Sequence, residues 1–141
     1  MDFEASFKIC SSGLSAQRAK MDVIMSNLAN VDTTRTPEGG PYIRKVVVLS
    51  SKALDGDFDD VLSDAVRSVN VEDVVEDRGN IKRIFDPGHP DADERGYVAF
   101  PNVSPVVEMA DMIMANRVYE ACVTAFDATK NMALKTLEMG K

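Results

Sequence analysis

The sequence predicts a mainly α protein in which long antiparallel N- and C-terminal helices flank a central region with a small β insert. Three observations predict this class. Apolar residues recur at alternating spacings of three and four in both terminal segments, which is typical of coiled-coil-like packing. Short β-branched runs bounded by glycine, proline or serine lie between these segments. The chain has 141 residues, which suits one modest domain.

We therefore divide the chain into residues 1–35, 36–103 and 104–141. The formal net charge is −7, and the acidic excess lies in residues 36–100, which hold eight basic and fourteen acidic side chains. The nearly neutral ends indicate surfaces that pack against something, whereas the acidic middle indicates a surface that faces water. An acidic chain also repels phosphate backbones, so we expect no nucleic-acid binding.

The N-terminal segment predicts a helix that ends near residue 30. Asn27 and Asn30 lie where asparagine tolerates the left-handed conformation that closes a helix. Residues 32–41 have the composition of a loop. The apolar stripe of this helix supplies four residues to the predicted packing seam: Leu14, Met21, Ile24 and Leu28.

The central segment predicts short strands and loops. Residues 42–49 form the strongest strand candidate, residues 71–75 and 81–85 are weaker ones, and residues 96–100 predict a short strand that ends at a proline. Residues 55–60 predict an acidic loop. If the helices are antiparallel, the chain ends lie together and this central segment forms a tip at the other end. Its strands are too few for an independent core, so we expect it to depend on the helices.

The C-terminal segment predicts a helix of about 35 residues. Ser104 is the predicted N-cap, and Pro105 suits the first helical position. Two adjacent apolar stripes make a face wider than one partner helix needs, so this helix requires more than one neighbour. The first stripe supplies the other residues of the predicted packing seam: Met109, Met112, Tyr119, Val123, Phe126 and Leu137. The second stripe includes Ala115, Val118, Cys122 and Met132.

No pattern in the sequence predicts catalysis, a metal or a cofactor. A calcium loop starting at Asp91 fails at its fifth and twelfth positions, which are Arg95 and Asn102, so we expect a rigid turn there. The single histidine has no partner motif for nucleophilic chemistry, and acidic pairs such as Asp59 and Asp60 lie in loops that favour solvent over a hydrolase site. The two cysteines are expected to behave as small apolar residues. Neither a secretory signal nor a membrane-spanning stretch is expected.

Two motifs resemble those of flagellar rod and hook proteins. Residues 12–18 and 26–31 are similar to the N-terminal signature of that family, including Ser26, Asn27 and Asn30. Residues 96–103 and the closing helix, with residues 117–121 and 132–138, carry the resemblance further. The second motif, together with the short chain, narrows the resemblance to a proximal-rod member, and its residues are Asp86, Pro87, Gly88, His89, Pro90, Asp91 and Asp93.

The resemblance implies a structural subunit of the bacterial flagellar basal body, exported through the flagellar type III apparatus. Both end segments would then form the core of a hollow, periplasm-spanning rod that transmits torque, and the N-terminal one would include the export signal region. Partners would be copies of the chain, other rod proteins and the export apparatus, with neither nucleic acid nor membrane insertion involved. Alternatives are another axial protein of the flagellum, or a helical export chaperone or adaptor, which would use similar heptads to hold its partner.

Overall fold

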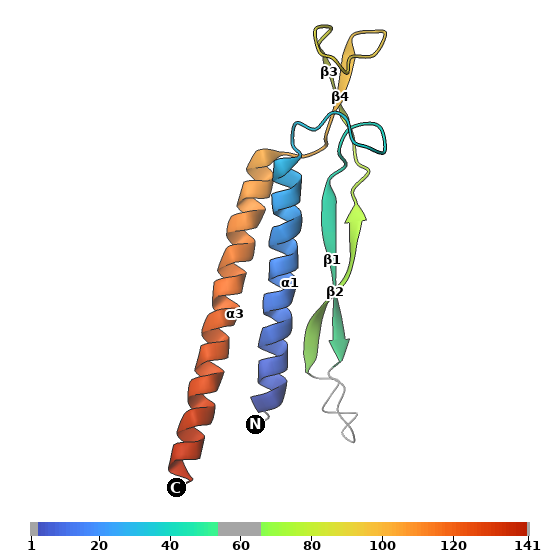
Figure 1. Cartoon of the computed structure of the whole chain (residues 1–141). Coiled ribbons are helices and arrows are strands. Elements are labelled where there is room, and N and C mark those ends of the chain that lie inside the picture. The colour runs from blue at the N-terminus through green and yellow to red at the C-terminus, as the bar shows by residue number, and fades with distance from the viewer. Residues whose placement is uncertain (1–2, 54–65, 141) are drawn as a thin grey trace.

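The computed structural model describes residues 3–53 and 66–140. Two long helices lie side by side, and a two-stranded ribbon runs along α1 on the side away from α3 (Figure 1). A second hairpin lies at the end of the molecule opposite to both chain termini (Figure 1). The elements are α1 (Phe3–Ala29), β1 (Lys45–Ala53), β2 (Arg67–Glu76), β3 (Lys82–Phe85), β4 (Tyr97–Phe100) and α3 (Pro105–Met139). The mainly α class with a small β insert is thus confirmed. The predicted acidic loop at residues 55–60 lies outside the described residues.

The ends of the helices agree with the sequence except at one cap. At the end of α1, the backbone N–H of Asn30 donates to the carbonyls of Ser26 and Asn27 at 3.2 and 3.3 Å. At the start of α3, Pro105 occupies the first turn as predicted, but the side chain of Ser104 makes no capping hydrogen bond. Ser104 is therefore the N-cap residue, as predicted, but it does not cap the helix through its side chain. A proline at this position has no N–H, so it removes one of the free donors at the helix start.

The ribbon of β1 and β2 corrects the predicted position of the central segment. The strands are antiparallel, with Lys45 opposite Glu76 and Ala53 opposite Arg67. The ribbon folds back along α1, where the backbone N–H of Val69 donates to Ser12 Oγ at 3.2 Å. Only the second hairpin extends past the helices as a tip (Figure 1). The physical reason is that two strands alone are marginally stable in water and gain stability by packing on a helix.

The tip hairpin pairs β3 with β4 in antiparallel register, with Phe85 opposite Tyr97. These two rings meet edge to face, with centroids 5.3 Å apart. Gly96, next to the pair, has a φ of 78°. A Cβ at this position would lie 2.9 Å from Phe85 Cε2, so the turn needs glycine for both its backbone and its space.

The contact between α1 and α3 is built around small residues. Ala16 and Ala115 are almost completely buried, and a Cβ on Gly13 would lie 3.1 Å from Cys122 Sγ. Nearer the chain termini, the rings of Phe7 and Phe126 pack with centroids 4.9 Å apart. Small side chains let the two helices approach closely, so the large apolar side chains of α3 are left to flank the contact.

Candidate assembly interface

A buried amide joins three elements at the top of the helix pair. Asn27 is 1% exposed, and its side chain satisfies every hydrogen-bonding position it has. Asn27 Oδ1 accepts from the Tyr42 hydroxyl at 3.0 Å and from the Lys45 N–H at 2.9 Å. Asn27 Nδ2 donates to the Lys45 carbonyl at 2.9 Å and to Glu108 Oε2 at 3.1 Å. The end of α1 is thereby fixed to the start of β1 and the start of α3.

This geometry corrects the role predicted for Asn27. It does not close the helix but lies inside α1, with its side chain turned into the junction. The junction also explains why the first strand begins at Lys45 and not at residue 42, because the Tyr42 side chain is buried in the junction. Tyr42 and Ser26 place their hydroxyl oxygens 3.3 Å apart, so the last turn of α1 and the loop are held together at two adjacent residues.

Arg44 carries the charge that balances the buried carboxylate. Arg44 Nε lies 2.7 Å from Glu108 Oε1, and Glu108 is completely buried. The same guanidinium reaches Asp111 at 3.6 Å and Asp77 at 3.7 Å. A buried carboxylate without such a partner is costly, so the ion pair and the amide of Asn27 belong to one structural unit.

Asn102 extends this unit to the segment that precedes α3. Asn102 Oδ1 accepts the backbone N–H of Arg44 at 3.0 Å, and its Nδ2 donates to the carbonyl of Asp77 at 2.7 Å. We define the polar junction as Asn27, Tyr42, Arg44, Asn102 and Glu108. It holds both hairpins in a fixed position relative to the ends of α1 and α3.

The motif at residues 86–93 forms a turn that is held by its own side chains. Asp86 Oδ1 accepts the N–H of Gly88 at 3.1 Å, and His89 Nδ1 accepts the N–H of Asp91 at 3.1 Å. Asp93 Oδ1 accepts two further backbone N–H groups, those of Arg95 and Tyr97. The carboxylate and imidazole groups of the motif therefore stabilise the turn by accepting hydrogen bonds from its backbone.

Asp91 connects this turn to the loop after α1. Its Oδ2 accepts from Thr34 Oγ1 at 2.8 Å, and its Oδ1 lies 3.8 Å from a guanidinium nitrogen of Arg35. Within that loop, Asn30 Nδ2 donates to the Ser26 carbonyl and Asn30 Oδ1 accepts from Thr33. The two motifs that were singled out in the sequence, at residues 26–31 and 86–93, thus meet through the loop between them.

The described residues show neither a metal cluster nor a membrane span. Over residues 3–53 and 66–140, no three histidine, cysteine or carboxylate side chains are grouped as a metal ion would need. In the same ranges, neither helix is long and apolar enough to cross a bilayer.

The structure distributes the predicted packing seam over two environments. Within α1, Ile24 is buried, whereas three others are half-buried: Leu14, Met21 and Leu28. On α3, Met112, Tyr119 and Phe126 are half-buried. The three remaining members are exposed in the single chain, at 56% for Met109, 37% for Val123 and 71% for Leu137. Met109 and Leu137 therefore have most of their surface open to solvent, whereas Val123 is only slightly more exposed than the half-buried members. The place of all three in a contact between subunits stays a prediction.

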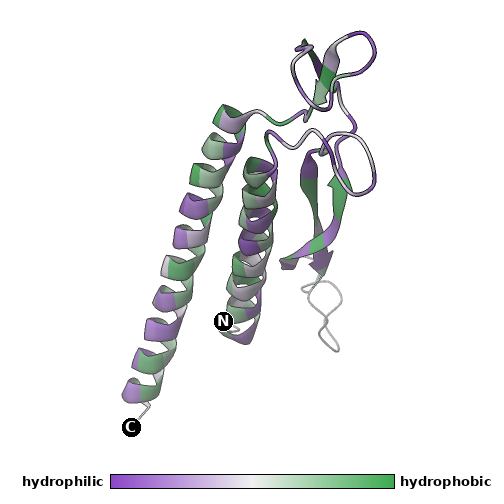
Figure 2. Cartoon of the chain, turned by 45° about the horizontal axis from the view of Figure 1, so that its top comes forward, coloured by the Kyte–Doolittle hydropathy of each residue, from purple (hydrophilic) through white to green (hydrophobic). Residues whose placement is uncertain are grey.

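Hydrophobic residues recur between hydrophilic ones along the whole length of α3 (Figure 2). Eleven large apolar residues of this helix are exposed: Val106, Val107, Met109, Ile113, Met114, Val118, Val123, Met132, Leu134, Leu137 and Met139. We call this set the exposed α3 face. Soluble monomers rarely leave apolar surface of this kind open, and such surfaces mark contacts with other proteins.

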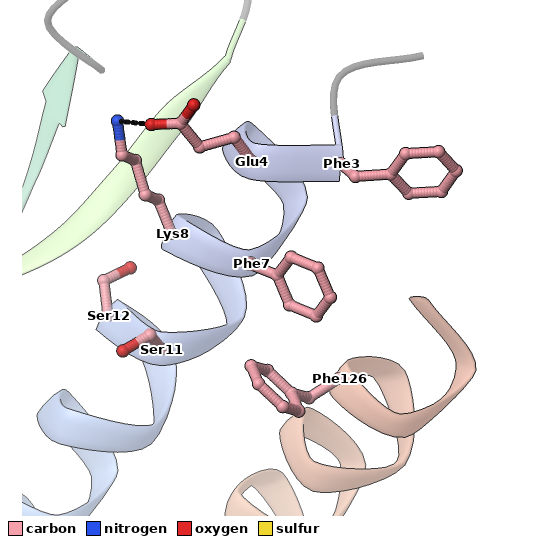
Figure 3. Close-up of a pocket in the computed structure, with 7 residues that line it drawn as sticks. All are labelled: Phe3, Glu4, Phe7, Lys8, Ser11, Ser12 and Phe126. Atoms are coloured by element: carbon pink, nitrogen blue, oxygen red, sulfur yellow. Dashed lines mark ion pairs between the residues drawn. The ribbon is translucent and has the colours of Figure 1, made fainter. Parts of the chain in front are cut away.

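An apolar groove lies near the N-terminal end of α1. It has a volume of about 840 Å³ and is lined by Phe3, Glu4, Phe7, Lys8, Ser11, Ser12 and Phe126. Figure 3 shows Phe3 and Phe7 projecting on the same side of α1 as Phe126 of α3, with Glu4 and Lys8 on another side. Glu4 and Lys8 form an ion pair of 2.7 Å between exposed side chains. The groove therefore has an aromatic wall that a neighbouring apolar side chain could contact.

Sequence reasoning missed the polar junction. It placed Tyr42 and Arg44 in a strand candidate and Glu108 within the C-terminal helix, without a contact between these segments. One signal was present in the sequence. Arg44 lies at the start of a β-branched run, and Glu108 lies on an otherwise apolar face in the first turn of the helix, so both charges are exceptions to their surroundings. Their pairing over 64 positions of sequence could not be seen without the fold.

Comparisons with known proteins agree with the resemblance of the terminal segments to flagellar rod proteins. Residues 7–35 match a family model described as flagella basal body rod protein, and residues 94–139 match one described as flagellar basal body rod FlgEFG protein C-terminal. The chain is 44% identical to the flagellar basal-body rod protein FlgC of Bacillus subtilis, covering 96% of this chain and 97% of the relative.

Two further relatives have the same description. The Aquifex aeolicus protein is 42% identical over all of this chain and 99% of its own length. The protein from Escherichia coli O157:H7 is 41% identical over 96% of both chains. Identity at this level over nearly the full length, together with the matched terminal segments, shows that the chain belongs to the FlgC family of flagellar basal-body rod proteins.

Proposed function

We propose that this chain is a structural subunit of the flagellar basal-body rod that assembles with copies of itself and with other rod proteins through α1 and α3. The observation that carries the proposal is the exposed α3 face. Its eleven large apolar side chains are more than the single partner helix α1 covers. Assembly would remove these side chains from water, and each Å² of apolar area buried would stabilise the assembly by about 25 cal/mol.

The C-terminal part of α3 extends this exposed surface beyond the helix pair. In Figure 1 the helix continues past the N-terminal end of α1. Three of its most C-terminal apolar residues are exposed at 49%, 71% and 82%: Leu134, Leu137 and Met139. This projecting end supports a contact with a second subunit, because no other element of the described chain lies beside it (Figure 1).

The groove lined by Phe3, Phe7 and Phe126 supports the same proposal from the other helix. It lies at the end of the molecule from which α3 projects, and its walls are aromatic. Apolar side chains from a neighbouring subunit would pack against these rings. Many such lateral contacts let a rod transmit torque, and this role requires no catalytic group.

Residues 1–35 and 104–141 would form the rod core in this proposal, and residues 36–103 the insert. We further propose that the N-terminal segment contains the signal for the flagellar type III export apparatus. The match of residues 7–35 to a rod-protein family model supports a role that the members of the family share.

The assembly proposal is tested with variants that add charge to the exposed α3 face. Met109→Glu and Leu137→Glu should leave the helical circular dichroism of the purified chain unchanged, since both side chains are exposed. In cells, each should abolish swimming and remove the chain from isolated hook–basal bodies. Asn131→Glu is the matched control, because it places the same charge at an exposed polar position of α3. Normal swimming of both apolar-site variants would refute the proposal.

A further inference from the structure

The β3–β4 hairpin presents an open face that no element of the described chain covers. Cross-strand pairing places Arg83 opposite Ala99 and Phe85 opposite Tyr97, and alternation puts both pairs on one face. Phe85 is 62% exposed and Tyr97 is 44% exposed. Beside them is a groove of about 370 Å³ lined by Arg83, Asp93, Arg95 and Tyr97. We call Arg83, Phe85, Arg95 and Tyr97 the hairpin face.

The charge of the hairpin face comes from two arginines. Arg83 and Arg95 are exposed, and neither makes an ion pair within residues 3–53 and 66–140. Asp93 faces the same groove, but its Oδ1 holds the turn by accepting the N–H groups of Arg95 and Tyr97 at 2.9 and 2.8 Å. Two guanidinium groups beside two exposed rings form a surface that suits carboxylates interleaved with apolar side chains.

A segment of this kind lies on β2 of the same protein. Glu72 and Asp73 are exposed and make no ion pair among the described residues. Val74 and Val75 follow directly and are 42% and 40% exposed. We call residues 72–75 the acidic valine segment. Because side chains alternate along a strand, Val74 and Val75 lie on opposite faces of β2, so a docked partner would contact one of these valines. The neighbouring carboxylates complement the two arginines, and that valine complements the exposed rings.

The two surfaces do not meet within one chain. The ribbon that contains β2 runs along α1, whereas the β3–β4 hairpin extends away from the helix ends (Figure 1). Both are held in place by the polar junction, because Asn102 precedes α3 and binds both Arg44 and Asp77. A contact between them therefore requires a second copy.

We propose that the hairpin face of one copy docks on the acidic valine segment of a second copy. This inference rests on one part of the proposed function, namely that copies of the chain lie next to each other in the rod. The two surfaces differ, so the contact is heterologous, and repeated contacts of this type build a ring or an open helical array instead of a symmetric dimer. The hairpins would thus add a second, outer set of contacts to those of α1 and α3.

The test reverses the charges of each surface in the full-length chain. One variant combines Arg83→Glu with Arg95→Glu, and the other combines Glu72→Lys with Asp73→Lys. Measured by sedimentation, each variant alone should self-associate at least about tenfold more weakly than the parent, because like charges then face each other. An equimolar mixture should regain the parent affinity, since both contacts in an alternating array join opposite charges.

A second measurement applies inside assembled rods. Phe85 is replaced by the photo-reactive residue benzoylphenylalanine, and cross-linked peptides are identified after irradiation of cells. The expected product joins position 85 to a peptide containing residues 72–75 of another copy, recognised by mixed isotope labelling. Benzoylphenylalanine at Val106, which is 76% exposed on α3, is the control and should not give that peptide.

The outcomes separate this inference from the proposed function. If Leu137→Glu blocks assembly while both charge-reversed variants assemble like the parent, the hairpin contact is refuted and the helix contact stands. If cross-links from position 85 reach only other peptides, the hairpin contact is also refuted. If the mixture regains affinity and the cross-link forms, the contact is supported whether or not the helix variants affect motility.

Discussion

The side-chain amide of Asn27 donates to the carboxylate of Glu108 at 3.1 Å, and both side chains are at most 1% exposed. This bond joins the last turn of α1 to the first turn of α3 across 81 positions of sequence. Since Asn27 also binds Lys45 and Tyr42, the same amide sets where the ribbon leaves the helices. The junction, rather than a large apolar core, thus determines how the hairpins are oriented on the helix pair.

Replacing Asn27 with alanine should strongly destabilise the chain. The change leaves the Tyr42 hydroxyl, the backbone groups of Lys45 and one oxygen of Glu108 without their partner, at an expected cost of about 3 kcal/mol in the free energy of unfolding. Urea denaturation followed by circular dichroism measures it. Asn116→Ala is the control, because Asn116 is exposed and has one long bond of 3.4 Å to Glu120. Equal losses in the two variants would contradict the junction.

Gly13 and Cys122 should be energetically coupled. A Cβ at Gly13 would lie 3.1 Å from Cys122 Sγ, which is closer than the sulfur accepts without moving. Gly13→Ala gains about 1 kcal/mol in helix propensity, so in a Cys122→Ala background it should stabilise the chain. With Cys122 present, the close contact between the added Cβ and the sulfur should offset the gain in helix propensity. Urea unfolding of the four proteins of this double-mutant cycle measures the coupling. A Gly13→Ala effect that is the same in both backgrounds would show that the sulfur is not the obstacle.

Gly96→Ala should disrupt the tip hairpin. The substitution places a side chain on a residue with φ of 78° and brings its Cβ within 2.9 Å of the Phe85 ring, so we expect a loss of about 1–2 kcal/mol in local stability. Faster proteolytic cleavage between residues 86 and 96 is the readout. Gly88→Ala should have little effect, because the nearest atom to its added Cβ is 3.6 Å away. Cleavage at the same rate in Gly96→Ala and the parent would contradict the steric argument.

Deletion of residues 1–20 should abolish export of the chain. The proposal assigns the export signal to the N-terminal segment, so the truncated chain should accumulate in the cell while other flagellar substrates are still secreted. Immunoblots of cell and secreted fractions, in a strain that releases unassembled subunits, measure this. A deletion of residues 120–140 is the control for loss of assembly alone and should still be secreted. Secretion of the chain lacking residues 1–20 at the parent level would show that these residues do not contain the export signal.

The sequence by itself determined the elements. The alternation of three and four residues predicted both helices, with ends close to those of α1 and α3. The β-branched run at residues 42–49 and the shorter runs at 71–75, 81–85 and 96–100 correspond to the four strands. These features depend on neighbours in sequence, because helix periodicity, strand propensity and the Gly-Pro boundaries are local properties. The resemblance to rod and hook proteins likewise came from short motifs.

Only the tertiary structure decided how these elements meet. The ribbon lies along α1 instead of at the tip, and the buried or half-buried residues of α3 include Ala115 and Cys122 as well as Met112 and Tyr119. Periodicity identifies a helix but not its rotation about its own axis, which depends on where small residues let the partner approach. The buried bond between Asn27 and Glu108 has the same origin, since the two residues are 81 positions apart and only the fold brings their polar groups together.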